Sequence, residues 1–192
     1  PGKVNLIPAN LRQAWRVENT SALGSPQSRW RIEVATGGKR LAYAVQKQRA
    51  SGAMMTFAFA RIGDKDKLTA LLIVKPDPSQ EGSAEWLNNF SRKVPVLIEV
   101  TSDLPNSSTG GKAAIKRFEL MPVTDWVAAG TTNTPGTRQI WLATSPEFMA
   151  QLASSTQFSI KPLWNTLPVV PKGLDEVTIF GLQGFKDAML AL

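Results

Sequence analysis

Nine short extended segments, each six to nine residues long, follow one another along the chain and constrain its fold more than any other feature. Residues 29–34 alternate polar and apolar side chains with period two, which is typical of a strand with one buried face. Residues 54–62 and 68–74 are apolar runs of strand length, and the turn-rich link between them predicts a hairpin. The other predicted strands are 41–48, 96–101, 113–120, 139–144, 156–161 and 177–183.

Turn residues separate these segments, and few stretches have helical character. Glycine, proline and asparagine clusters lie at 36–38, 105–111 and 131–136. Ser145 and Pro146 form a helix start, because a serine can accept a bond from an orphan amide and proline is preset for the first helical position. Shorter helices are expected at 84–90 and 184–192. Nine strands with two or three brief helices predict a single all-β domain, an antiparallel sandwich or barrel.

The chain of 192 residues contains no cysteine and no histidine. This excludes Ser-His-Asp and Cys-His nucleophilic sites, imidazole bases, thiolate metal cages and disulfide frameworks. An enzyme is therefore disfavoured, although carboxylate-based hydrolysis needs neither residue. We expect no catalytic residue, no cofactor and no metal ligand, and no apolar stretch is long enough to span a membrane.

The net charge of +7 is unevenly distributed. Residues 1–61 contain ten basic and two acidic side chains, a balance of +8, whereas the remainder has twelve basic and thirteen acidic ones. Such an excess suits an anionic partner such as nucleic acid, although scattered, solvated side chains on strands produce the same count. The candidate RNA-facing residues are Arg12, Arg16, Arg29 and Arg31.

Several motifs have a simpler structural interpretation. The carboxylates of Asp64 and Asp66 are expected to lie in a solvated hairpin turn rather than at a cation site. The Gly110–Lys112 stretch lacks the spacing of a phosphate loop and predicts a hairpin connection. Six tryptophans, which in principle stack on bases, are spread evenly and are expected in the core or at subunit contacts.

Residues 41–165 resemble the jelly-roll coat proteins of picorna-like viruses. The segment 50–59 is similar to a strand opening with a small residue and glycine before alternating apolar positions, as in the small coat proteins of the plant comovirus, nepovirus and cheravirus group (Secoviridae). Four further segments follow in the order of that family's later strands: 71–76, 96–100, 140–146 and 158–160. The family commonly contains cysteine and histidine, so this chain departs from it in composition.

The resemblance implies a single eight-stranded jelly-roll domain over residues 1–192, with an N-terminal segment at 1–28 and a C-terminal extension at 165–192. It implies a structural protein, released from a polyprotein, that assembles with copies of itself and other coat subunits into an icosahedral shell around single-stranded RNA. The expected location is the virion, assembled in the host cytoplasm, with non-specific RNA contact and no membrane partner. The start at Pro1 agrees with proteolytic release.

Two other classes stay open. The tail 180–189 is similar to the closing segment of invasion-associated locus B proteins, which have an apolar-Leu-x-Gly-Phe string near their end, and this implies a secreted or periplasmic bacterial β-sandwich protein. Those proteins typically contain cysteine pairs. A carbohydrate-binding or carboxylate-based hydrolytic sandwich is the third class, supported by strands and tryptophans alone.

Overall fold

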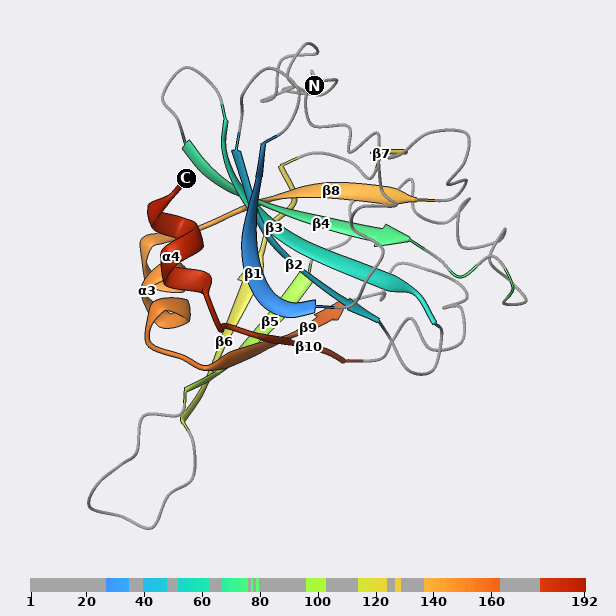
Figure 1. Ribbon diagram of the computed structural model, residues 1–192. Coiled ribbons are helices and arrows are strands. Elements are labelled where there is room, and N and C mark those ends of the chain that lie inside the picture. The colour runs from blue at the N-terminus through green and yellow to red at the C-terminus, as the bar shows by residue number, and fades with distance from the viewer. Residues whose placement is uncertain are drawn as a thin grey trace, which may run out of the picture.

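The computed structural model describes residues 27–34, 40–47, 52–62, 67–75, 77, 79, 96–102, 114–123, 127–128, 137–162 and 177–192. Within these ranges the chain is all-β, with two antiparallel sheets and two short helices (Figure 1). The larger sheet contains, in spatial order, β1 (Gln27–Val34), β2 (Arg40–Lys47), β3 (Met54–Ile62), β4 (Lys67–Lys75), β8 (Arg138–Ala143) and β7 (Val127–Ala128). The smaller sheet contains β10 (Thr178–Gly181), β9 (Gln157–Pro162), β5 (Val96–Ser102) and β6 (Ala114–Leu120).

The nine predicted strands are confirmed to within two residues at each end, and β3 and β4 form the predicted hairpin. The two-residue strand β7 was not predicted, because a segment so short carries no periodicity. The predicted helices at Ser145 and at the C-terminus are α3 (Pro146–Ala153) and α4 (Phe185–Leu190). The helix expected at 84–90 lies outside the described residues.

The jelly-roll order is not confirmed. A jelly roll is built from two Greek keys, in which a long connection returns a strand to lie beside the first. Here β1, β2, β3 and β4 follow one another as neighbours in one sheet. Only a few residues separate each pair, and short connections between strands favour adjacent antiparallel pairing.

The main core lies between the two sheets and is rich in aromatic rings. Phe57 contacts Phe158 edge to face with ring centroids 5.3 Å apart, which joins the larger sheet to the smaller one. The rings of Phe158 and Phe180 stack at the same centroid distance, and Trp30 meets Phe185 of α4 at 5.1 Å. These rings are all buried, and such pairs contribute about 0.5–1.5 kcal/mol beyond their buried area.

The larger sheet is buried on its second face as well. The strand register aligns Tyr43, Ala58, Leu71 and Trp141 in one row across β2, β3, β4 and β8, and all four side chains are buried. Residues on alternate positions of the same strands face the main core. Burial on both faces explains why β4 has an apolar run instead of an alternating pattern.

The expected C-terminal extension at 165–192 is, in its described part, integral to the sandwich. Strand β10 pairs with β9, and α4 buries Phe185 and Ala188. The indole Nε1 of Trp30 donates a hydrogen bond to the Gly181 carbonyl at 2.8 Å. The described part of the tail therefore adds a strand to the smaller sheet.

Candidate interaction surfaces

The four arginines predicted to face RNA are only partly described. Arg12 and Arg16 lie outside the described residues, whereas Arg29 and Arg31 lie on β1. Arg29 is exposed, and its side-chain carbons lie beside Gly184. Arg31 is half-buried, and its guanidinium lies over the ring of Tyr43 at 5.5 Å from the centroid. Arg31 thus makes a contact within its own fold.

Tyr43 is the centre of a small polar cluster on the second face of the larger sheet. Burial raises the pKa of its phenol above 10.0, and the nearby charge of Glu33 raises it further. The positive charge of the Arg31 guanidinium lowers the pKa of Tyr43, whereas a side-chain hydrogen bond with Glu33 raises it. The neutral phenol is therefore the favoured form in the folded protein.

The smaller sheet turns its second face outward, and we call this the outer face. Antiparallel register aligns Ile179, Ser159, Glu99 and Arg117 in one row from β10 to β6. The adjacent row contains Lys161, Leu97 and Glu119. Every second residue of each strand points to this face, whereas Phe158, Ile160 and Phe180 point to the core.

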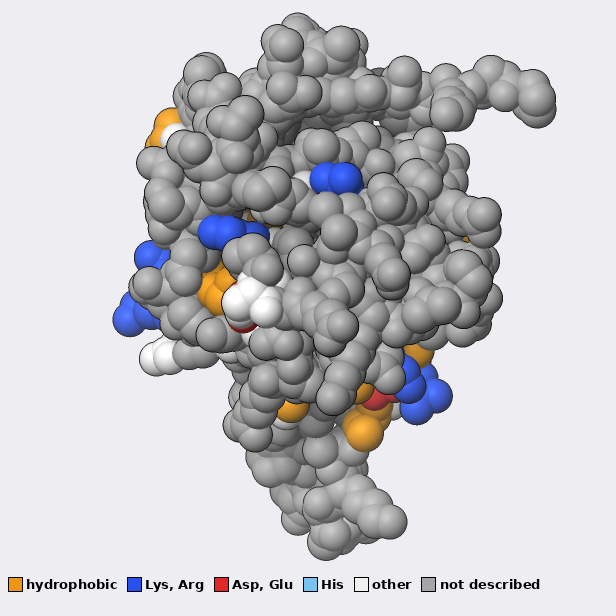
Figure 2. Space-filling view, turned by 90° about the vertical axis from the view of Figure 1, so that its right-hand side faces the viewer, with side chains coloured by type: hydrophobic (Ala, Val, Ile, Leu, Met, Phe, Trp, Pro, Cys, Tyr) orange, Lys and Arg blue, Asp and Glu red, His pale blue; other side chains and the backbone are white. Residues whose placement is uncertain are grey.

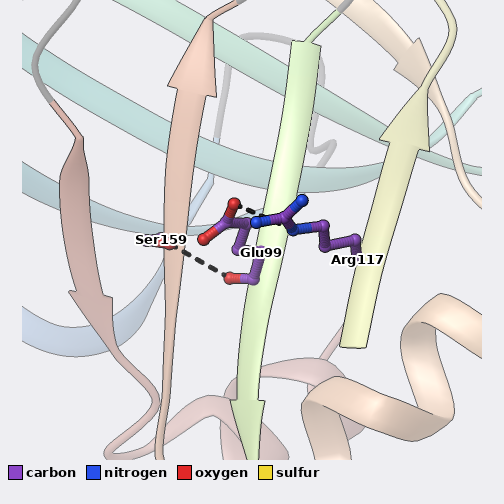
Figure 3. A network of polar contacts seen from close by, with 3 residues as sticks. All are labelled: Glu99, Arg117 and Ser159. Atoms are coloured by element: carbon purple, nitrogen blue, oxygen red, sulfur yellow. Dashed lines mark hydrogen bonds and ion pairs between the residues drawn. The ribbon is translucent and has the colours of Figure 1, made fainter. Parts of the chain in front are cut away.

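A polar network ties the middle of the outer face together (Figure 3). The Nε of Arg117 lies 3.1 Å from Oε1 of Glu99, and Ser159 donates its hydroxyl to the Glu99 carbonyl at 3.3 Å. Arg117 is largely exposed, and an exposed pair of this kind contributes only about 0–1 kcal/mol to stability. The pair leaves the Arg117 guanidinium accessible from solvent.

Large apolar side chains are exposed at both edges of this face. Six such side chains are exposed among the described residues. Ile115 on β6 and Ile179 on β10 lie on the outer face, and Val177 directly precedes β10. The others are Val34 on β1, Leu190 on α4 and Met121, whose carbonyl accepts a hydrogen bond from the Ala143 amide of β8 in the larger sheet. Figure 2 shows hydrophobic, basic and acidic side chains close together at the lower right of one side of the molecule. Exposed aliphatic groups gathered in this way mark a contact surface more often than scattered ones do.

A small cavity of about 260 Å³ lies between the end of α3 and the start of α4. Leu152, Leu182 and Phe185 form its apolar walls, and Ser155, Lys186 and Asp187 are polar lining residues. Ligand pockets usually occupy about 300–1,000 Å³. The cavity is smaller than that range, and its single carboxylate provides no acid-base pair.

The described ranges contain no group of three or more histidine, cysteine, aspartate or glutamate residues that could hold a metal ion. None of the described helices is long and apolar enough to cross a membrane. Residues 64–66 and 110–112, assigned above to turns, lie outside the described residues. Of the six tryptophans, Trp30 and Trp141 are confirmed in buried positions, and the other four lie outside the described ranges.

Comparison with known protein families, with curated proteins and with solved structures gives no match in any of the three.

Two features were missed by sequence reasoning. The Glu33–Tyr43 pair depends on β1 lying beside β2, and the outer face depends on β10 lying beside β9. The period-two alternation gave the residues that share one face of each strand. The order of the strands, which brings those residues together, has no local sequence signal.

Proposed function

We propose that this chain is a non-enzymatic binding protein of the secreted or periplasmic β-sandwich class, similar to invasion-associated locus B proteins. The observation that carries the proposal is the construction of the closing segment. It contains the apolar-Leu-x-Gly-Phe string on which the resemblance depends, and Leu182, Gly184 and Phe185 of that string each have a distinct structural requirement.

Leu182 and Phe185 are buried in the core. Gly184 has φ +79°, and a Cβ atom at this position would lie 3.1 Å from the backbone oxygen of Trp30. The Gln183 carbonyl accepts a bond from the Trp30 amide at 2.9 Å. The string therefore forms the turn through which the C-terminal segment is hydrogen-bonded to the first strand. A protein with the same string is expected to make the same connection, and this supports a shared fold class.

Binding is preferred over catalysis because the chain lacks histidine and cysteine and because the carboxylate of Glu99 is engaged by Arg117. The outer face offers instead a mixed apolar and charged surface, the type of surface that contacts other proteins.

Cell fractionation of the bacterium that produces the protein tests this proposal, together with light scattering of the purified chain. We expect recovery in the periplasmic or secreted fraction and a small species in solution. Retention in the cytoplasm would overturn the class, and so would a particle of megadalton mass.

The second candidate is the coat-protein function, a jelly-roll subunit of an RNA-containing shell. The exposed aliphatic side chains of the outer face favour it, because a shell subunit buries such groups against its neighbours. Closed particles of uniform size by negative-stain microscopy are expected under this hypothesis. Replacement of Arg12, Arg16, Arg29 and Arg31 by alanine is then expected to lower the packaged RNA without unfolding the domain. Unchanged RNA content in assembled shells would contradict the arginine assignment.

A further inference from the structure

We propose that the outer face is the interface of a two-fold symmetric dimer, in which the smaller sheets of two copies of this chain pack face to face. This goes beyond the binding function proposed above, because it assigns the occupant of the face as a second copy. Three properties of the face support this: its apolar edges, its internal symmetry and its charge balance.

The large apolar side chains at the edges of the face are exposed to solvent, and a partner would bury them. Ile115 is 62% exposed on β6, and Ile179 is 55% exposed on β10. Val177, which is 42% exposed, precedes β10 directly. The centre of the face between these edges contains the side chains of Ser159 and Glu99, with the half-buried Leu97 beside Glu119 in the adjacent row. A partner that matches this face must therefore be apolar at two edges and mixed in the middle.

The order of residues on β6 makes the face self-complementary. The outward side chains along this strand are Ile115, Arg117 and Glu119. A two-fold axis that crosses the strands between the rows of Arg117 and Glu119 reverses this order in the second copy. Arg117 then lies opposite Glu119, and this pair occurs twice, as an isologous contact requires.

The same two-fold axis also pairs side chains of the two copies at the opposite edge of the sheet, beside β10. The register connects the row of Arg117 through Glu99 and Ser159 to Ile179. The neighbouring row connects Glu119 to Lys161, and Val177 lies two residues before Ile179. Reversal of the rows therefore places Val177 opposite Ile179 of the second copy. One symmetry operation therefore pairs opposite charges on β6 and apolar groups beside β10.

Charge favours a second copy over a nucleic acid or a strongly charged protein. The chain as a whole has a net charge of +7, which opposes self-association through most surfaces. The outer face contains Arg117 and Lys161 against Glu99 and Glu119, so its charges balance. A balanced face neither repels its own copy nor attracts a polyanion.

The size of the face sets the expected affinity. Four strands about 4.8 Å apart and about six residues long at about 3.3 Å per residue give a footprint of about 400 Å². A standard interface buries about 800 Å² per partner, so we expect a weak, concentration-dependent dimer.

Sedimentation velocity over a concentration series up to about 100 μM tests the dimer. The wild-type chain is expected to show a concentration-dependent monomer–dimer equilibrium. Ile179→Lys is expected to weaken association at least tenfold, because it places a charge at an apolar contact. Val34→Lys is the matched control, since Val34 is similarly exposed at 62% but lies on β1, away from the outer face. A wild-type monomer throughout the series, or equal effects of both variants, would overturn the proposal.

A mixing experiment tests the symmetry axis. Arg117→Glu creates two acid–acid contacts in a homodimer, and Glu119→Arg creates two base–base contacts, so each variant alone is expected to stay monomeric. A one-to-one mixture restores both opposite-charge pairs and is expected to regain the heterodimer. Thermal unfolding of each variant shows whether loss of the Glu99 contact has damaged the fold. A mixture of folded variants that stays monomeric would exclude this axis. Saturable binding of an added polyanion to the wild-type chain, in place of self-association, would assign the face to nucleic acid.

Discussion

At the residue scale, Gly184 is a position where the backbone strongly favours glycine. Its φ of +79° lies in the left-handed region, and a Cβ atom here would lie 3.1 Å from the Trp30 carbonyl oxygen, so a side chain at this position is strained. We expect Gly184→Ala to destabilise the protein by about 1–3 kcal/mol, measured by urea unfolding. Gln183→Ala is the control, because the exposed Gln183 contributes its backbone carbonyl, which the variant retains. Equal midpoints for the two variants would contradict this account.

Tyr43 provides a second residue-scale prediction, since it is the single tyrosine of the chain and phenolate absorbance therefore reports it alone. Its pKa is raised in the folded state, so the folded protein holds its proton to a higher pH than the unfolded chain does. The stability from this group is complete below pH 10.0 and is lost as the pH rises through the folded pKa.

Variants of the two charged neighbours separate the causes of that shift. Glu33→Gln is expected to lower the pKa of Tyr43, because it removes the negative charge, whereas Arg31→Ala is expected to raise it. Alkaline absorbance titration measures both changes. Shifts in the same direction for both variants would show that the electrostatic account is wrong.

At the element scale, α3 begins where the sequence predicted. The Ser145 hydroxyl accepts a hydrogen bond from the Phe148 amide at 3.1 Å, and Pro146 occupies the first turn. We expect Ser145→Ala to cost about 1 kcal/mol of stability and Ser145→Asp to retain most of it, because aspartate also caps. Chemical denaturation of the three proteins measures this, and an aspartate variant as unstable as the alanine variant would refute the capping role.

Element identity was the most predictable level of this structure. The alternation of residues 29–34 and the apolar runs of β3 and β4 are local signals, and turn residues mark their ends. The hairpin of β3 and β4 was also predictable, because four residues connect them. β10 was predicted as a strand, but its place beside β9 was not, because that pairing joins residues far apart in the sequence.

At the scale of the whole molecule, the first strand and the last segment stabilise one another. Trp30 donates two hydrogen bonds to the 181–183 turn, and its ring contacts Phe185 of α4. We expect removal of residues 177–192 to abolish cooperative folding, because it uncovers Trp30 and Phe158 and removes an edge strand. Near-ultraviolet circular dichroism and dye binding to exposed apolar surface measure this loss. A truncated chain with a cooperative thermal transition would show that the tail is an extension after all.

The candidate sites could also be predicted only in part from the sequence. The arginines at 29 and 31 could be identified from charge counting, but the contact of Arg31 with Tyr43 could not, because it depends on the β1–β2 register. The alternation of Ile115, Arg117 and Glu119 with the intervening residues is present in the sequence. Its significance appeared only when the structure placed these side chains on an outward face.

By itself, the sequence determined the class of fold and the chemistry it excludes: antiparallel strands with turn-rich links, no thiol and no imidazole. These are properties of residue type and short-range periodicity. The tertiary structure decided the meander of β1–β4, the burial of the larger sheet on both faces and the exposure of the smaller one on its outer face. Such properties depend on which strands become neighbours, and that is set by long-range packing rather than by any local pattern.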